Sequence, residues 1–311
     1  WRLQQETKHE MAIIDPSVNT TFAINDKEDD GSFEIGDVMD FAFTYKNSSD
    51  LLLKNAELKL TLEGDTKLLD LTKFRFSGKK PPEVKDNTIT WTKANFDGLE
   101  KIEPGKDASI EWSIPSVTSS EAFGKDAKNL KITSSISFTF DLEDADIKKE
   151  DFPDKKHDII SRLASEATLL SEARYYDDDR SKVGSGPLPP EANSSTSFRI
   201  YWRLQNTMND LEKGVVKMQL PADITWDQTA KAESGSITYN IEDRTVVWSI
   251  PKIAAHTNPA DGKMEAYFNI TAHPTQDDLG KVIILTGETN FTAKDSFTGD
   301  EVTAKGSILN S

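Results

Sequence analysis

The stretch Asn55-Ala-Glu-Leu-Lys-Leu-Thr-Leu-Glu63 alternates apolar and polar side chains residue by residue. Successive side chains of a β-strand point to opposite faces, so this period of two places the alanine and the three leucines on one buried face. The alternation returns in residues 110–114 and 132–140, and turn-forming runs such as Pro104-Gly105 separate these stretches. Short alternating strands between polar turns are typical of antiparallel β-sandwiches and barrels.

The two halves of the chain carry these patterns in the same order. Residues 39–47 align with residues 198–206, and residues 86–91 align with residues 243–248. Matches that keep their order and confine their gaps to loops indicate a duplicated domain. Between these two aligned ranges we expect the alignment to shift by one residue in a turn. The shifted alignment predicts further equivalent positions: Ala56 with Val216, Leu58 with Met218, and Leu60 with Leu220.

A length of 311 residues suits two domains of ordinary size. Residues 160–176 carry apolar side chains at helical spacing and also alternate as a strand, so periodicity alone leaves both structures open there. The repeat favours a strand, and we place the boundary between the domains near residue 167.

The run from Ile35 to Asn47, Ile-Gly-Asp-Val-Met-Asp-Phe-Ala-Phe-Thr-Tyr-Lys-Asn, resembles an immunoglobulin-like repeat of bacterial and archaeal surface proteins. The second half carries the motifs Ala173-Arg-Tyr-Tyr176, Gly184-Ser-Gly-Pro-Leu-Pro-Pro190, Leu220-Pro221 and Leu285-Thr-Gly-Glu288. With these motifs it resembles one variety of that repeat, found in surface proteins of ultrasmall candidate-phyla bacteria. The first half lacks the proline-rich loop.

The resemblance implies an all-β fold of two tandem immunoglobulin-like antiparallel β-sandwiches, over residues 11–167 and 168–311. It transfers a structural or adhesive role and no catalytic residue. In such proteins a membrane helix precedes the repeats, so residues 1–10 would form a juxtamembrane or linker segment. We therefore expect an extracellular protein on the cell surface, anchored by a helix that precedes this chain.

The charge and composition exclude several classes of partner. The net charge is −16, which repels the phosphates of nucleic acids and anionic lipid surfaces. The absence of cysteine excludes disulfides, thiol catalysis and cysteine-based zinc sites. No apolar run approaches the roughly 20 residues of a membrane-spanning helix, so contact with a membrane is expected only through a segment outside this chain.

Catalytic motifs are absent from the sequence. The four histidines, His9, His157, His256 and His273, do not share a metal-ligand spacing. The chain also lacks a nucleophile elbow, a P-loop and a dinucleotide-binding fingerprint. We predict that the protein is not an enzyme.

Carboxylates at Asp26, Glu28, Asp30 and Asp37, with a glycine after the third, have the spacing of a calcium-binding loop. Calcium prefers six to eight oxygen ligands, and a tight glycine turn brings alternate side chains together. The glutamate and the last aspartate depart from the usual pattern, and the flanks are strand-like. The alternative is a solvated acidic hairpin turn. Calcium is the one cofactor that the sequence suggests, and residues 141–146 and 177–179 are further acidic clusters.

The expected function is that of a non-catalytic structural cell-surface protein: a stalk, a component of an S-layer or other surface lattice, or an appendage subunit. Its partners would be other copies of itself or other surface proteins. The alternative is an adhesin-type binding module that recognises a host glycan or protein through its loops. Trp226, at the end of a predicted strand, is then the candidate aromatic platform.

Overall fold

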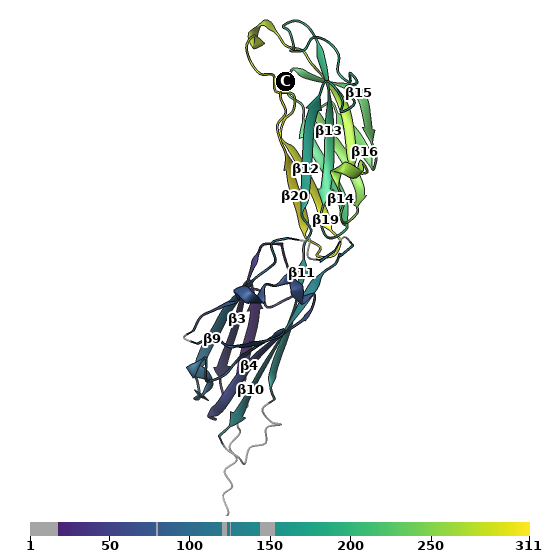
Figure 1. Cartoon of the computed structure of the whole chain (residues 1–311). Helices are drawn as coiled ribbons and strands as arrows, with labels where there is room; N and C mark the ends of the chain where they lie inside the picture. Colours follow the sequence, from purple (N-terminus) through teal and green to yellow (C-terminus); the bar gives the residue numbers. More distant parts are fainter. Residues whose placement is uncertain (1–17, 79, 120–122, 125, 144–152) are drawn as a thin grey trace, which may run out of the picture. The chain divides into compact units, whose positions relative to one another are not determined.

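The computed structural model describes residues 18–78, 80–119, 123–124, 126–143 and 153–311. These residues form β-strands and short 3₁₀ helices of three residues, and they contain no α-helix. The strands build two antiparallel sandwiches (Figure 1). The predicted all-β fold of two tandem immunoglobulin-like sandwiches is confirmed, and residues 160–176 form strand over 160–163 and 167–174 and no helix. The expected segment 1–10 lies outside the described residues.

The first sandwich packs a sheet of order β1-β3-β9-β5 against a sheet of order β2-β11-β10-β4-β7-β6, with β8 paired to β4. Its strands are β1 (Val18–Ile24), β2 (Gly31–Phe33), β3 (Val38–Asn47), β4 (Leu53–Gly64), β5 (Arg75–Phe76), β6 (Glu83–Lys85), β7 (Thr88–Trp91), β8 (Lys101–Ile102), β9 (Asp107–Pro115), β10 (Lys131–Leu142) and β11 (Lys155–Leu163).

The second sandwich packs a sheet of order β12-β13-β18-β15 against a sheet of order β16-β17-β14-β19-β20. Its strands are β12 (Ala167–Arg174), β13 (Thr196–Asn206), β14 (Leu211–Gln219), β15 (Ile224–Ala232), β16 (Ser236–Asn240), β17 (Thr245–Ile253), β18 (Glu265–Ala272), β19 (Thr289–Asp295) and β20 (Glu301–Gly306).

The two sandwiches share one strand order. The sheet β1-β3-β9-β5 corresponds strand for strand to β12-β13-β18-β15, and the series β11-β10-β4-β7-β6 corresponds to β20-β19-β14-β17-β16. In each, the first two long strands share a sheet and the third crosses to the other, as in immunoglobulin-like folds. The common topology supports the duplication that the sequence pattern indicates.

The structure corrects the predicted equivalence of β4 and β14. Leu58 pairs with Phe138 and Trp91, whereas Val216 pairs with Phe291 and Trp248. Leu58 therefore corresponds to Val216, two residues away from the predicted Met218. Because a shift of two keeps side chains on the same face, the alternation of the sequence fits both alignments equally well. Only the cross-strand partners distinguish them.

Each core is built on aromatic rings between the sheets. The ring centroids of Trp112 and Trp91 are 4.5 Å apart in the first sandwich, and those of Trp202 and Phe268 are 4.9 Å apart in the second. The tryptophans predicted as core residues are all buried: Trp91, Trp112, Trp202 and Trp248. Such rings bury about 150–250 Å² each and dominate the energetics of a core.

The first and last strands of each sandwich run in the same direction. In the second sandwich, the backbone N–H of Ser165, just before β12, donates to Asp295 (2.9 Å), beside the start of β20. Farther along both strands, a Cβ on Gly306 would lie 3.1 Å from the Cβ of Ser171. Figure 1 shows β12 and β20 side by side.

The first sandwich repeats this arrangement with β1 and β11. Thr20 hydrogen-bonds His157 (2.8 Å), and Asp30, farther along, accepts from the backbone N–H of Ile160 (2.9 Å). We call the end of a sandwich where its first strand begins the N-terminal end, and the end where its last strand finishes the C-terminal end. In both sandwiches the chain thus begins at one end and leaves at the opposite end.

The chain forms two compact units. Unit 1 comprises Trp1–Gly31, Gly36–Val117 and Lys131–Ser161, and unit 2 comprises Ser32–Ile35, Thr118–Leu130 and Arg162–Ser311. Residues 164–166 separate β11 from β12. The boundary at residue 167 stays a prediction.

A buried asparagine closes the N-terminal end of each sandwich. The side-chain amide of Asn47 donates to the carbonyls of Leu51 (2.7 Å) and Ile102 (2.9 Å), and its oxygen accepts from Ser49. Asn206 repeats this, donating to the carbonyls of Asn209 (2.7 Å) and Ala254 (2.9 Å). One side chain therefore joins two loops that are far apart in the sequence.

We expect the substitution Asn47→Ala to lower the free energy of unfolding of the first sandwich by about 3 kcal/mol, because it leaves buried carbonyls and a serine without partners. Chemical denaturation monitored by tryptophan fluorescence measures this change. Asn87→Ala, at an exposed turn asparagine, is the matched control and should leave the midpoint unchanged. An Asn47→Ala midpoint equal to that of Asn87→Ala would show that the buried amide contributes nothing.

Candidate functional site

The predicted calcium loop begins as a tight hairpin turn. Asn25 and Asp26 both have positive φ (51° and 62°), and the backbones of Ile24 and Lys27 exchange hydrogen bonds of 2.9 and 3.1 Å. Asparagine and aspartate tolerate this left-handed conformation, which two-residue hairpin turns require. The side chains of Asp26 and Glu28 are exposed on this turn.

The other two predicted ligands are exposed and lie farther along the chain. The Asp30 carboxylate accepts from the backbone N–H of Ile160, and the backbone carbonyl of Asp37 accepts from Ser116 (2.7 Å). In the described part of the chain, no three histidine, aspartate or glutamate side chains gather into a group that could hold a metal. Calcium binding stays a prediction, and the structure gives Asp30 a structural contact with β11.

The other acidic clusters differ in their surroundings. Asp177 is engaged by Arg174 and Tyr201, whereas Asp179 bonds the backbone N–H of Ser181 (2.8 Å). In the cluster at residues 141–146, Asp141 is described and accepts from Asn55 (3.2 Å). The cluster's remaining carboxylates from residue 144 onward lie outside the described residues.

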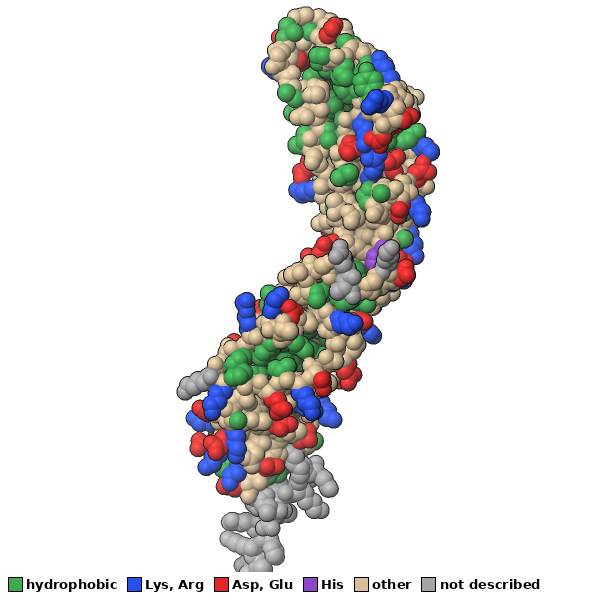
Figure 2. Space-filling view, viewed as in Figure 1, with side chains coloured by type: hydrophobic (Ala, Val, Ile, Leu, Met, Phe, Trp, Pro, Cys, Tyr) green, Lys and Arg blue, Asp and Glu red, His purple; other side chains and the backbone are tan. Residues whose placement is uncertain are grey.

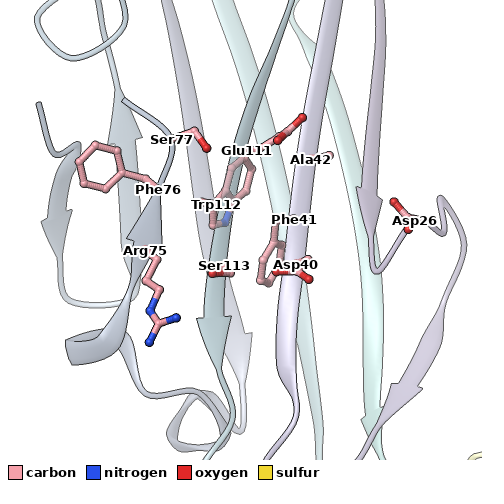
Figure 3. A pocket seen from close by; sticks show the side chains of 10 residues that line it. All are labelled: Asp26, Asp40, Phe41, Ala42, Arg75, Phe76, Ser77, Glu111, Trp112 and Ser113. Carbon is pink, nitrogen blue, oxygen red and sulfur yellow. The ribbon is translucent and has the colours of Figure 1, made fainter. Parts of the chain in front are cut away.

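A groove of about 470 Å³ lies on the outer face of the sheet β1-β3-β9-β5 (Figure 3). Figure 3 shows Asp40 and Ser113 on neighbouring strands, with Arg75 on one side and Asp26 on the other. The groove therefore presents charges of both signs and hydroxyl groups. These are the groups of a polar surface, and no histidine lines the groove to act as a base.

A network of arginines and tyrosines covers the outer face of the sheet β12-β13-β18. The Tyr201 ring is buried between two guanidinium groups, those of Arg174 (5.3 Å from the ring centroid) and Arg203 (5.1 Å). Glu172 joins both arginines, with N–O distances of 2.7 and 3.0 Å, and Glu265 pairs with Arg203. Stacking and ion pairing together hold these three strands in register on their solvent side.

The Tyr201 hydroxyl ties this network to the loop after β12. It donates to Asp177 (2.8 Å), and this hydrogen bond is the main reason that the pKa of Asp177 lies below its usual value. Burial raises the pKa of Tyr201 in turn, so the hydroxyl stays a donor at neutral pH.

Arg199 occupies a different position on the same face. Its guanidinium lies 4.5 Å from the Tyr267 ring centroid, and its Nε donates to Asn269 (3.0 Å). Arg174 is its cross-strand neighbour. Among the described residues no carboxylate lies within ion-pair distance of Arg199, unlike Arg174 and Arg203. A stacked guanidinium without a paired carboxylate can bind an anionic group.

Trp226, the candidate aromatic platform, is half-buried. Its ring stacks on Tyr239 and Phe268, with centroids 5.4 and 5.1 Å away, and it packs against the core. These contacts give the side chain a packing role beside β16. The sequence pattern did not single out Arg199 or Tyr267, because alternation identifies the outward face of a strand but not its cross-strand neighbours.

No protein-family model and no curated protein matches the chain. Among solved structures, it is similar to the C-terminal domain of the antigen I/II-family protein AspA of Streptococcus pyogenes. That similarity has 11% identity and a TM-score of 0.31, over 93% of this chain and 99% of that one.

Two further similarities cover smaller parts. One is to a family 123 glycoside hydrolase of Clostridium perfringens, with 12% identity and a TM-score of 0.27, over 48% of this chain and 27% of that one. The other is to three N-terminal domains of the pilus tip protein Mfa5 of Porphyromonas gingivalis, with 10% identity and a TM-score of 0.24, over 34% and 23%. At these scores none of the three bears on function.

We expect Tyr201→Phe to destabilise the second sandwich by about 1 kcal/mol at neutral pH, because it removes a hydrogen bond to a charged carboxylate. A lowered folded-state pKa stabilises the fold above the unfolded pKa of about 4 and loses that contribution as the pH falls through the folded value. The difference from the wild type should therefore vanish in acid. Thermal unfolding between pH 3 and 7 measures it.

Tyr267→Phe is the matched control on the same face, since its hydroxyl has no hydrogen bond to Asp177. It should leave both the pH profile and the pKa of Asp177, followed by carbon NMR, as in the wild type. A Tyr201→Phe profile parallel to that of Tyr267→Phe at every pH would exclude the proposed role of the hydroxyl.

Proposed function

We propose that this chain is a non-catalytic structural protein of a cell surface, and that its sandwiches act as load-bearing segments of a stalk or appendage. The observation that carries the proposal is the parallel course of the first and last strands in each sandwich. Because the chain begins at one end of a sandwich and leaves at the other, tension along the chain acts along the strands.

This geometry loads many hydrogen bonds at once. In the second sandwich β12 pairs with β13 over the whole of Ala167–Arg174, and β20 pairs with β19 from Glu301 to Gly306. Pulling the ends of the sandwich apart must slide each terminal strand along its partner, so a full ladder breaks together. If both attachment points lay at the same end of the sandwich, the force would break the same hydrogen bonds one after another.

One sequence feature agrees with a surface location. The resemblance of the second half to surface proteins of ultrasmall bacteria rests on its Ala173-Arg-Tyr-Tyr176 and proline-rich motifs. Within the described residues no helix is long and apolar enough to cross a membrane.

Single-molecule pulling tests the load-bearing proposal, and the cysteine-free chain allows attachment at two engineered cysteines. In one variant, Thr168→Cys and Ser307→Cys place the attachments at opposite ends of the second sandwich. In the matched variant, Thr168→Cys and Asp300→Cys place both at the N-terminal end. All three positions are exposed.

We expect the variant with attachments at opposite ends to unfold at a clearly higher force and in a single event. That event should lengthen the chain by about 45 nm, because each released residue adds about 3.4 Å. The same-end pair should unfold at lower force with a similar lengthening. Equal forces for the two variants would contradict a load-bearing role for the parallel terminal strands.

An adhesin-type binding module remains the alternative function, and Arg199 is the observation that favours it. A guanidinium stacked on Tyr267 beside the Asn269 amide has the chemistry to bind a carboxylate-bearing sugar. The ligand class would be an acidic glycan, bound on the sheet face rather than by the loops.

Titration with hexuronic acid oligosaccharides, followed by NMR, tests this alternative. Binding should shift the signals of Tyr267 and Asn269, and Arg199→Gln should weaken it at least about tenfold, by roughly 1.4 kcal/mol. Arg162→Gln, at a half-buried arginine outside this face, is the control. Unchanged spectra at millimolar oligosaccharide would leave the Arg199 face without a binding role.

A further inference from the structure

Apolar side chains are exposed at the C-terminal end of the second sandwich. Leu279, Val282, Ile284 and Ile308 have exposed fractions of 65%, 64%, 57% and 56%. We call these four residues the C-terminal patch. Figure 2 shows hydrophobic side chains gathered at this end of the second sandwich, where Figure 1 marks the end of the chain. Clustered exposed apolar residues at one end of a domain indicate an interaction surface.

The patch is held by main-chain hydrogen bonds. Ile284 and Asn310 form an antiparallel β-bridge. The backbone N–H of Leu285 donates to the carbonyl of Leu309 (2.8 Å), and the backbone N–H of Ser311 donates to the carbonyl of Ile283 (3.0 Å). Ile283 and Leu309 pack against the core. The exposed side chains alternate with these inward-facing ones, so the patch is fixed relative to the sandwich.

The repeat indicates what kind of surface the patch contacts. Three patch residues lie in the loop between β18 and β19, which corresponds to the loop between β9 and β10. Part of that corresponding loop, Thr118–Leu130, belongs to unit 2. Within unit 2, the N–H of Asn129 donates to Asn209 (3.0 Å), and the carbonyl of Ala127 hydrogen-bonds His256 (2.8 Å).

Asn209 and His256 both lie at the N-terminal end of the second sandwich, beside the buried Asn206. The N-terminal end of the second sandwich therefore binds residues of the β9–β10 loop. The first sandwich has part of this surface. Asn47 corresponds to Asn206, and Gly105 corresponds to His256 with positive φ at both positions, although Gly105 offers no side chain in place of the His256 ring. The half-buried leucines at positions 51 and 52 lie at this surface.

We propose that the C-terminal patch binds the N-terminal end of the first sandwich in a second copy of this chain. The proposal rests on the structural role given above and names the partner for it. Such a contact joins two different surfaces, so each added copy leaves one of each surface open. Head-to-tail addition therefore continues and produces a filament.

The charge of the chain gives the interaction a characteristic salt dependence. Each copy has a net charge of −16, so two copies repel one another over about 10 Å at 0.1 M salt. The patch itself is apolar, and its burial does not depend on charge. Association should therefore strengthen as sodium chloride is raised, the opposite of an interface built on ion pairs.

Sedimentation velocity of the full chain over a range of concentrations tests the proposal with three variants. The tail variant is Val282→Lys with Ile284→Lys. The head variant is Leu51→Lys with Leu52→Lys. The control, Thr168→Lys with Leu170→Lys, adds the same charge at exposed positions on β12.

We expect the wild type and the control to self-associate and the tail and head variants to lose at least about tenfold in association constant. An equimolar mixture of tail and head variants should form a dimer and nothing larger, because only one intact pair of surfaces remains. If the head variant alone still associates through its patch, or the wild type stays monomeric at all concentrations, the proposal is overturned.

Two controls keep the result decisive. Thermal unfolding verifies that each variant is folded, and Asp50→Arg, at an exposed position of the same end, replaces the leucine double variant if that one unfolds. Sedimentation with phosphatidylcholine vesicles tests the other occupant of an apolar patch. Vesicle binding by a chain that stays monomeric would overturn the proposal. Neither outcome affects the pulling experiment, which measures single molecules.

Discussion

The structure depends on burying alternate side chains between two sheets. The long strands β3, β4, β9 and β10 bury alternate residues, so their aromatic and aliphatic positions interlock, and their equivalents in the second sandwich do the same. Once the inner face is fixed, the outer face is free to vary. The second sandwich carries the Arg–Tyr network there, and the first carries a polar groove.

Buried polar groups appear where the sheets end and the backbone must turn. Asn47 and Asn206 satisfy carbonyls of two loops each, and in the second sandwich the buried carboxylate of Asp295 accepts four hydrogen bonds. A buried carboxylate of this kind is stable only because its donors are held in place. These side-chain hydrogen bonds thus join the loops at the N-terminal end of each sandwich.

Sequence reasoning identified the fold, the duplication and the core tryptophans because local periodicity carries that information. It also aligned Asn47 with Asn206, although the hydrogen bonds that give these residues their role join segments distant in the sequence. It placed Leu58 opposite the wrong residue of the second half, since a shift of two keeps the same face. Arg199 was missed because its significance lies in its cross-strand neighbours and in the carboxylate that it lacks.

The sequence by itself determined the alternating strands of residues 55–63, 110–114 and 132–140, the buried side of each, and the repeated order of patterns in the two halves. Those properties follow from side-chain alternation over a few neighbouring residues. Only the tertiary structure decided that the first and last strands of each sandwich run in parallel. It also decided that Asp30 bonds β11, while the predicted calcium ligands form no cluster among the described residues. It likewise placed the exposed side chains of Val282 and Ile284 on one surface with that of Ile308. These depend on contacts between residues far apart in the chain, which local patterns do not encode.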